Sequence, residues 1–185
     1  SRYENDAISI HIIGFAKAVG DITNGARGVI LFFILAFVIT SALLYVYAGS
    51  LNLTMLVLIS AVTPVVWLLG LLPLLGFGID PMTILVPFLI FSIGVSHGVQ
   101  MMNAWKRAAF KGADGTVAAR NSFLKLMIPG SVALATDALG FLVILHIKIA
   151  MVRELGITAS LGIALMIITN MLLLPLLLSY ARLSD

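Results

Sequence analysis

The chain has 185 residues, of which 61% are hydrophobic and only 10% are charged, and its mean hydropathy is +1.15. Soluble domains carry about 25% charged residues, so this composition excludes a soluble globular domain and indicates an integral membrane protein. The net charge of +3 comes mostly from basic residues at the ends of apolar runs, which favours a role in membrane topology over nucleic-acid binding. The absence of cysteine excludes disulfides and thiolate metal sites.

Residues 1–28 form the one sizeable water-compatible segment. Ile8 to Ile13 could form the end of a strand, and the following residues predict an amphipathic helix at the membrane interface. We expect Gly25 to Gly28 to break this helix. No signal-peptide pattern is present and the chain starts at Ser1, so we expect an excised piece of a longer protein.

Five apolar runs follow, each close to the roughly 20 residues that a helix needs to cross the hydrocarbon core. They cover about residues 29–47, 53–75, 82–105, 123–147 and 155–180. Their hydrophobicity is continuous rather than alternating, which favours helices over a β-barrel. The sequence therefore predicts an all-α fold, a polytopic membrane helix bundle of five transmembrane helices within a domain spanning residues 29–182.

The loop after the third run fixes the expected orientation. Residues 106–122 carry four basic residues against one acid, and we expect them to form an amphipathic helix on anionic lipid headgroups. Because basic loops stay in the cytoplasm, this loop is predicted to be cytoplasmic. Residues 1–28 and 76–81 are then periplasmic.

The third run carries a polar stretch flanked by glycines. Ser96 and His97 lie between Gly94 and Gly98, and Gln100 follows. Polar groups inside a membrane are costly and usually face protein or water, and small residues beside them let another helix approach closely. We therefore expect a functional site here, with Gly94 and Gly98 on one helix face that packs against a neighbour.

Two further runs carry strongly polar side chains at what the sequence predicts to be a similar depth. At about 1.5 Å per residue, His97 lies roughly 14 Å from Lys106, and Asp137 and Asn170 lie roughly 18 Å from the nearest basic span end. All three fall near the middle of a core about 30 Å thick. We expect a proton relay formed by His97, Asp137 and Ser96, supported by the polar side chains of Asn170, Thr136 and Gln100.

Each of these residues also has a purely structural interpretation. Asp137 could be a carboxyl that only holds helices together, His97 could bond to a helix backbone, and Asn170 could join two helices. Against this, intramembrane carboxylates commonly relay protons or cations, and imidazole exchanges protons near neutral pH. Gly140, with Gly130, is expected to be a packing site.

Metal binding and catalysis are poorly supported. No H-E-x-x-H or H-x-x-E-H pattern occurs, and two of the three histidines lie at predicted interfaces, so no metal and no cofactor are expected. Ser96 and His97 are adjacent on a helix and point about 100° apart, so the imidazole cannot easily activate its neighbour. An intramembrane enzyme using His97 and Asp137 is the weakest of the functions considered, and we expect the protein not to be an enzyme.

The order of these elements resembles one half of a resistance–nodulation–division (RND) transporter of the hydrophobe-exporter branch, which includes the MMPL, hopanoid-exporter and Patched relatives. The five runs resemble TM2–TM6 of such a half, over about residues 8–182. The segment from Val86 to Gln100 is similar to the TM4 signature, and Thr136 to Phe141 is similar to the TM5 motif. Arg153 to Gly156, together with Asn170 to Pro175, is similar to TM6.

The resemblance implies a proton-motive-force-driven exporter of lipid-like or hydrophobic molecules in the bacterial inner membrane. The alternative is a sterol-sensing-like binding or regulatory domain that does not pump. The TM4 motif of the family has Asp-Tyr where this chain has Ser96-His97, so His97, Asp137 or a residue of the other half must carry the proton. The implied partners are membrane lipids, a hydrophobic substrate, the remaining half and a periplasmic porter domain. A homo-oligomer and periplasmic accessory proteins are further partners that the resemblance allows.

Overall fold

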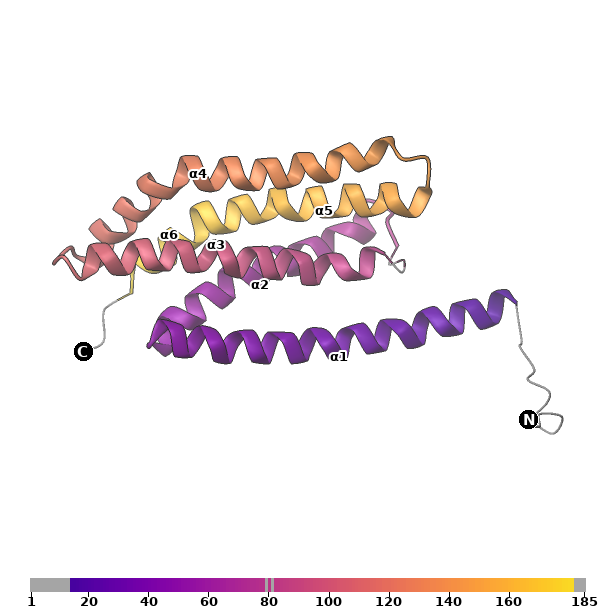
Figure 1. The fold of residues 1–185 in the computed structure, drawn as a ribbon, viewed down its shortest axis with the longest axis horizontal. Helices are drawn as coiled ribbons and strands as arrows, with labels where there is room; N and C mark the ends of the chain where they lie inside the picture. Colours follow the sequence, from indigo (N-terminus) through magenta and orange to yellow (C-terminus); the bar gives the residue numbers. More distant parts are fainter. Residues whose placement is uncertain (1–13, 79, 81, 182–185) are drawn as a thin grey trace.

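The computed structural model describes residues 14–78, 80 and 82–181, and within them every regular element is a helix. The elements are α1 (Phe15–Ala48), α2 (Leu51–Leu74), η1 (Thr83–Leu85), α3 (Val86–Ala109), α4 (Gly115–Val143), η2 (Ile144–His146), α5 (Ala150–Ile168), η3 (Thr169–Leu173) and α6 (Leu174–Ser179) (Figure 1). Among the described residues, five helical segments are long and apolar enough to cross a membrane, and the fifth is the continuous segment formed by α5, η3 and α6. The prediction of an all-α bundle of five spanning helices is confirmed.

The first helix differs from its prediction. α1 is continuous over 34 residues and passes through Gly25 and Gly28, where the sequence predicted a break. A glycine inside a helix costs only about 1 kcal/mol relative to alanine, which is too little to end a long helix on its own. The strand end predicted within residues 8–13 lies outside the described residues.

The connection between α3 and α4 is shorter than the loop predicted over residues 106–122. α3 continues to Ala109 and α4 starts at Gly115, so only residues 110–114 join them, and no separate amphipathic helix forms. The Asp114 side chain accepts a hydrogen bond from the Thr116 backbone N–H and caps α4. The buried Trp105 side chain donates through Nε1 to the Gly115 carbonyl at 3.1 Å, which ties the two helices together beside this turn.

The last membrane segment changes its helical type in the middle. α5 passes into the π-helix η3 at Thr169, and the regular helix resumes as α6 at Leu174. The Leu174 backbone N–H donates to the carbonyl of Thr169, five residues back, as a π-helix requires. Single π turns occur mostly inside α-helices and frequently at functional sites.

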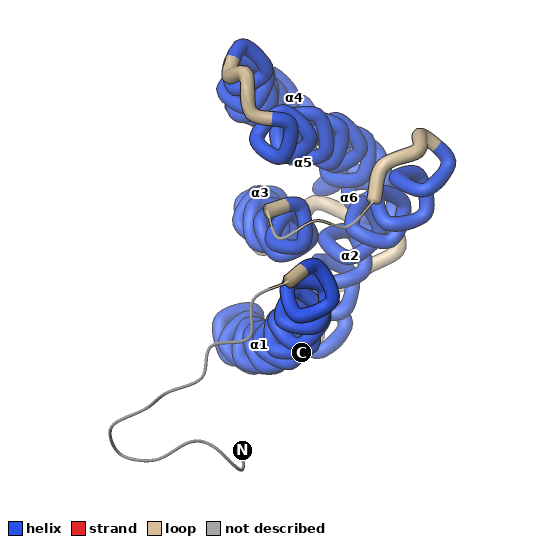
Figure 2. Tube along the Cα trace, turned by 90° about the vertical axis from the view of Figure 1, so that its right-hand side faces the viewer, coloured by secondary structure: helices blue, strands red, loops and turns tan. Residues whose placement is uncertain are grey.

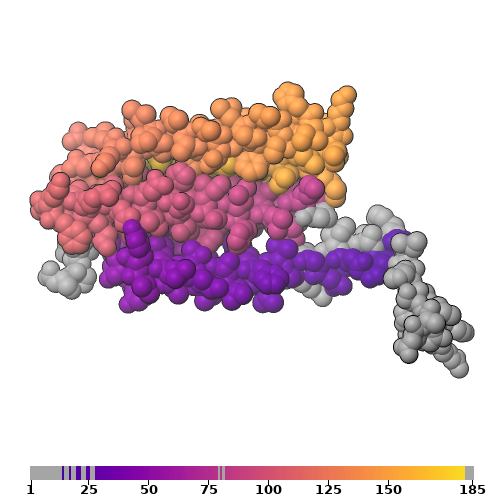
Figure 3. Space-filling model, viewed as in Figure 1, coloured from indigo at the N-terminus to yellow at the C-terminus, as the bar shows by residue number. Residues whose placement is uncertain are grey.

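Four helices form the body of the bundle and α1 lies beside it. In the end-on view of Figure 2, α4 and α5 lie at the top, α3 and α2 in the middle and α1 at the bottom. α1 forms a ridge along one edge of the molecule (Figure 3) and exposes most of its large apolar side chains. Phe33 and Phe37 contact Phe91 of α3 at ring-centroid distances of 5.7 and 5.4 Å.

Two hydrogen bonds join the end of α1 to the end of α3. Lys106 donates through Nζ to the Ala48 carbonyl at 2.8 Å, and Asn103 donates to the Tyr47 hydroxyl at 2.7 Å. Both contacts lie at the end of the bundle that also holds the α3–α4 turn. We call this end the basic end, because Arg107, Lys111 and Lys125 lie there as well.

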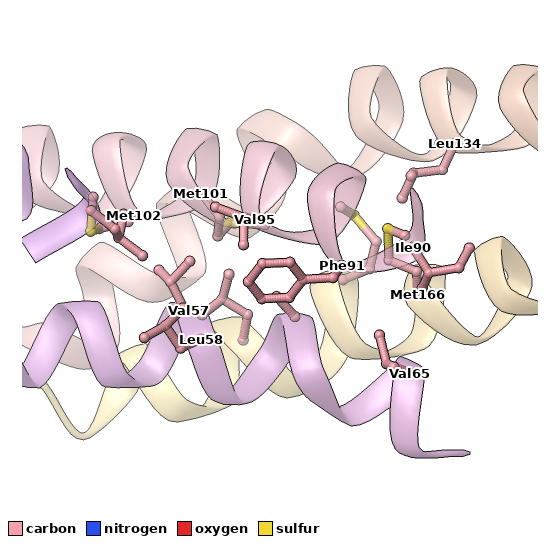
Figure 4. Close-up of a cluster of buried hydrophobic side chains, with 14 of the residues drawn as sticks. Val57, Leu58, Val65, Ile90, Phe91, Val95, Met101, Met102, Leu134 and Met166 are labelled. Atoms are coloured by element: carbon pink, nitrogen blue, oxygen red, sulfur yellow. The ribbon is translucent and has the colours of Figure 1, made fainter. Parts of the chain in front are cut away.

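The core is built mainly from aliphatic, methionine and aromatic side chains of α2, α3, α4, α5 and α6. Figure 4 shows Val57 and Leu58 of α2 below Val95 and Met101 of α3. Further along, Ile90, Met166 and Leu134 bring α3, α5 and α4 together, and all three side chains are fully buried (Figure 4). Dense packing of this kind fixes the relative heights of the helices, which decides which polar residues meet.

Candidate functional site

His97 lies in the middle of α3 and is half-buried. Its Nδ1 lies 3.1 Å from the carbonyl oxygen of Ile93, one turn earlier in the same helix. An imidazole nitrogen that bonds to a carbonyl must carry the proton, so Nδ1 is the donor and Nε2 is left as the proton-accepting atom. The imidazole is therefore held to its own helix and keeps one nitrogen available.

Two glycines beside His97 bring α3 against α2. A Cβ placed on Gly94 would lie 3.2 Å from Ala61 Cα, and one on Gly98 would lie 2.8 Å from Val57 Cγ1. Both glycines are buried. The shared face expected for Gly94 and Gly98 is therefore the face on which α3 meets α2.

Asn170 is buried in the π-helix η3 and faces Gly98. It is 1% exposed, and neither its Oδ1 nor its Nδ2 has a hydrogen-bond partner among the described residues. Its Oδ1 would lie 3.7 Å from a Cβ on Gly98. Burying an amide without hydrogen-bond partners costs about 1–3 kcal/mol of folding free energy, so the Asn170 amide does not stabilise the folded bundle.

Asp137 and Thr136 lie on the surface of α4, not in the core. Both are exposed, and the Thr136 hydroxyl donates to the Val132 carbonyl of its own helix at 2.8 Å. Gly140 shares this exposed region, and a Cβ placed on it would meet nothing within 4 Å. The expected packing role of Gly140 is therefore not seen, because this face of α4 has no neighbour among the described residues.

The contacts between helices place His97 and Asp137 at different depths. Gly98 of α3 faces Asn170, and Gly130 of α4 faces Met171, so Gly98 and Gly130 lie at about one level. Asp137 lies seven residues beyond Gly130, which is about 10 Å along the helix axis.

The Ser160 hydroxyl donates to the Ala138 carbonyl at 3.2 Å, which fixes Asp137 at the level of the middle of α5. The prediction of similar depth for His97 and Asp137 is therefore wrong. The two depths were measured from Lys106 and from Lys125, on the assumption that both lysines lie at one level. Relative to Gly98 and Gly130, the levels of the two lysines differ by about one helical turn. No hydrogen bond between His97 and Asp137 occurs in the described part of the chain.

Ser96 and Gln100 are exposed on α3 and point away from the face that meets α2. Ser96 lines an open cleft of about 200 Å³ between α1 and α3. The other lining residues are hydroxyl-bearing or apolar: Thr40, Phe88, Phe91, Ser92 and Val95. The structure thus separates the polar residues: His97 is bonded to its own helix, Asn170 faces Gly98, Ser96 lines this cleft and Asp137 lies on the surface of α4.

These polar residues are recognisable in the sequence, but the contacts that each of them makes are not. Asn170 lies in the π-helix η3 and its amide has no partner among the described residues, and nothing in the local sequence predicted that π-helix. Among the residues that the structure describes, no three His, Cys, Asp or Glu side chains lie together as metal ligands would.

The comparisons with known proteins agree with this architecture. The Patched family model, described as Patched SSD, matches residues 26–180. A protein of Methanocaldococcus jannaschii described only as a membrane protein is 26% identical over 121 residues, which cover 65% of this chain and 31% of that relative. No solved structure matches the chain. Because the family match extends over most of the five membrane-spanning segments, it confirms the Patched-like resemblance, and this multi-pass membrane protein belongs to the Patched family.

Proposed function

We propose that the chain is part of a proton-motive-force-driven transporter that exports lipid-like or hydrophobic molecules. The observation that carries the proposal is the presence of two titratable side chains, His97 and Asp137, within the apolar middle of spans in a Patched-family protein. Ionisable groups in membrane spans are expensive to keep and are usually tied to ion or proton movement. No catalytic role is proposed for them.

His97 is the proposed proton carrier. Its Nδ1 bond to Ile93 fixes the ring orientation, and Nε2 can accept and release a proton without breaking that bond. The RND TM4 signature that Val86 to Gln100 resembles has Asp-Tyr at the positions of Ser96 and His97. The proposal therefore moves the proton-carrying role from that carboxylate to the imidazole one residue later.

Asp137 is the proposed second station of the relay. Since it lies about 10 Å from His97 along the bundle axis, a proton passes between them through water or through a conformational change, not directly. Ser96 and Gln100 are exposed on α3, and Thr136 is exposed on α4. We propose that the remaining half of the transporter docks against these exposed parts of α3 and α4.

The proposed orientation follows from the charge distribution. Basic end residues stay in the cytoplasm, so the α3–α4 turn is cytoplasmic and residues 76–81 are periplasmic. The protein then lies in the cytoplasmic membrane, with a porter domain, a hydrophobic substrate and periplasmic accessory proteins as proposed partners. The chain spans 31% of its archaeal relative, which leaves room for such domains in a complete protein of that length.

The test is transport by the complete protein in proteoliposomes. A fluorescent lipid analogue should move across the bilayer when a pH gradient is imposed, and the movement should stop when a protonophore collapses the gradient. Transport that persists without a gradient would reject proton coupling. Gradient-independent binding of a sterol or other hydrophobe, with no movement at all, would favour the sensing function instead.

A further inference from the structure

A second polar site lies at the basic end of the bundle, in the angle between α3 and α4. A cavity of about 310 Å³ is lined by three cationic side chains, those of Arg107, Lys111 and Lys125, and by Asn121. Within the part of the chain that the structure describes, no acidic side chain lines it. Among the described residues, none of the three cations forms a salt bridge, the ion pair present being Lys17–Asp21 far away in the chain. Three positive charges thus converge on one hollow whose described lining holds no carboxylate.

Small residues create the hollow. Ala104 and Ala108 of α3, with Ala113 of the turn, form its floor, and Trp105 holds the adjacent start of α4 by its bond to Gly115. The Ser122 hydroxyl is already bonded to the Ala118 carbonyl at 2.7 Å. The groups left to bind a ligand are therefore the three cations and the Asn121 amide, all of them exposed.

The cavity lies at the boundary of the apolar part of α4. Between Leu126 and Leu145 the only charged residue is Asp137, and a segment of this length crosses a hydrocarbon core of about 30 Å. Lys125 thus marks the point where α4 enters the hydrocarbon. Ligands of this cavity meet the membrane at the level of the lipid headgroups.

One stripe of α4 continues from the cavity into the membrane. Asn121, Lys125, Ile128 and Val132 follow each other at spacings of three or four residues, so they share a helix face. Ile128 and Val132 are 67% and 60% exposed. The stripe begins with hydrogen-bonding and cationic groups and goes on with exposed apolar ones, which is the polarity profile of a phospholipid.

We propose that this cavity binds the phosphate-bearing headgroup of an anionic phospholipid, with the acyl chains lying along Ile128 and Val132. Arginine and lysine side chains bind phosphate through charge-assisted hydrogen bonds, and basic pockets between membrane helices suit such headgroups. The site requires neither the transport activity nor the proposed orientation, because it depends only on the cavity and its level in the membrane.

The experiment measures lipid retention by native mass spectrometry of the purified protein, titrated with phosphatidylglycerol or with phosphatidylcholine of the same acyl chains. The unmodified protein should retain phosphatidylglycerol preferentially. Each basic residue near an anionic surface is worth about fivefold in binding, so Arg107→Gln/Lys111→Gln/Lys125→Gln should lower the apparent affinity on the order of a hundredfold. The matched control Arg120→Gln/Lys148→Gln/Arg153→Gln removes as many cations outside the cavity and should keep the preference.

A variant that retains all three cations tests the cavity itself. Ala108→Leu narrows the hollow and should also abolish the preference, and a melting curve shows that each variant is folded. Equal retention of phosphatidylglycerol by the cavity variants and the unmodified protein would overturn the proposal, as would an equal loss in the control. If inorganic phosphate raises the melting temperature only when the three cations are present, while lipid retention is unchanged by their removal, the ligand is a free anion and the lipid site is rejected.

Discussion

At the scale of single residues, two buried threonines of the last membrane segment differ in their hydrogen bonding. Thr158 is fully buried and its hydroxyl has no partner among the described residues, whereas the equally buried Thr169 donates to the Met166 carbonyl at 3.1 Å. Removing an unpartnered hydroxyl relieves a desolvation cost, so Thr158→Val should stabilise the protein by about 1 kcal/mol or more. Thr169→Val should destabilise it by about 0.5–1.5 kcal/mol. Thermal melting in detergent would contradict this account if the two variants ranked in the opposite order.

Asn170 extends the same argument to a residue of the candidate site. Asn170→Leu replaces an unpartnered amide by an apolar side chain with the same branching, and should raise the free energy of unfolding by about 1–3 kcal/mol. If the amide serves the transport cycle, transport should fall although the protein becomes more stable. A loss of both stability and transport would instead mean that the amide has a partner that stabilises the fold, and Asn170→Ala serves as the reference for simple truncation.

At the scale of helices, the glycines of α3 and α4 have opposite surroundings. A Cβ on Gly98 would lie 2.8 Å from Val57 Cγ1, so Gly98→Ala should push α3 from α2 and destabilise the bundle by about 1–3 kcal/mol. A Cβ on Gly140 meets nothing within 4 Å, so Gly140→Ala should be neutral or stabilising by up to about 1 kcal/mol. Melting curves of the two variants check the pair, and equal destabilisation would show that α4 has a neighbour at Gly140 in the assembled protein.

The helices themselves could largely be predicted from the sequence, because an apolar run of about 20 residues has few stable alternatives to a membrane-spanning helix. The ends of these helices could not, since α1 continues through Gly25 and α3 extends beyond the apolar run to Ala109. The π-helix at Thr169–Leu173 also escaped prediction, because no local sequence signal for it was identified.

The candidate site could be predicted by residue but not by arrangement. Polar side chains within apolar runs, such as His97 and Asp137, can be recognised directly from the sequence. Their relative height depends on the stagger of packed helices, which is set by contacts such as Gly98 with Val57 and Ser160 with Ala138. The basic residues of the cavity were visible as well, but only the short turn over 110–114 brings Arg107 and Lys125 to one hollow.

At the scale of the whole molecule, the proposed orientation is open to direct labelling. The chain has no cysteine, so a single cysteine reports one position without background. Thr116→Cys at the basic end and Gly78→Cys at the opposite end both replace exposed residues. In intact cells an impermeant thiol reagent should label Gly78→Cys and leave Thr116→Cys unlabelled until the membrane is opened. The reverse pattern would invert the topology.

In the proposed function, the protons that drive transport pass through His97 and Asp137. The most direct measurement is substrate movement by the complete protein in proteoliposomes with an imposed pH gradient, comparing His97→Phe/Asp137→Asn with the control His146→Phe/Glu154→Gln, whose residues lie at the end of the bundle away from the basic end. The first variant should keep its melting temperature and lose gradient-driven transport, while the control should transport normally. Normal gradient-driven transport by His97→Phe/Asp137→Asn would reject the proposed relay and place the proton path outside these spans.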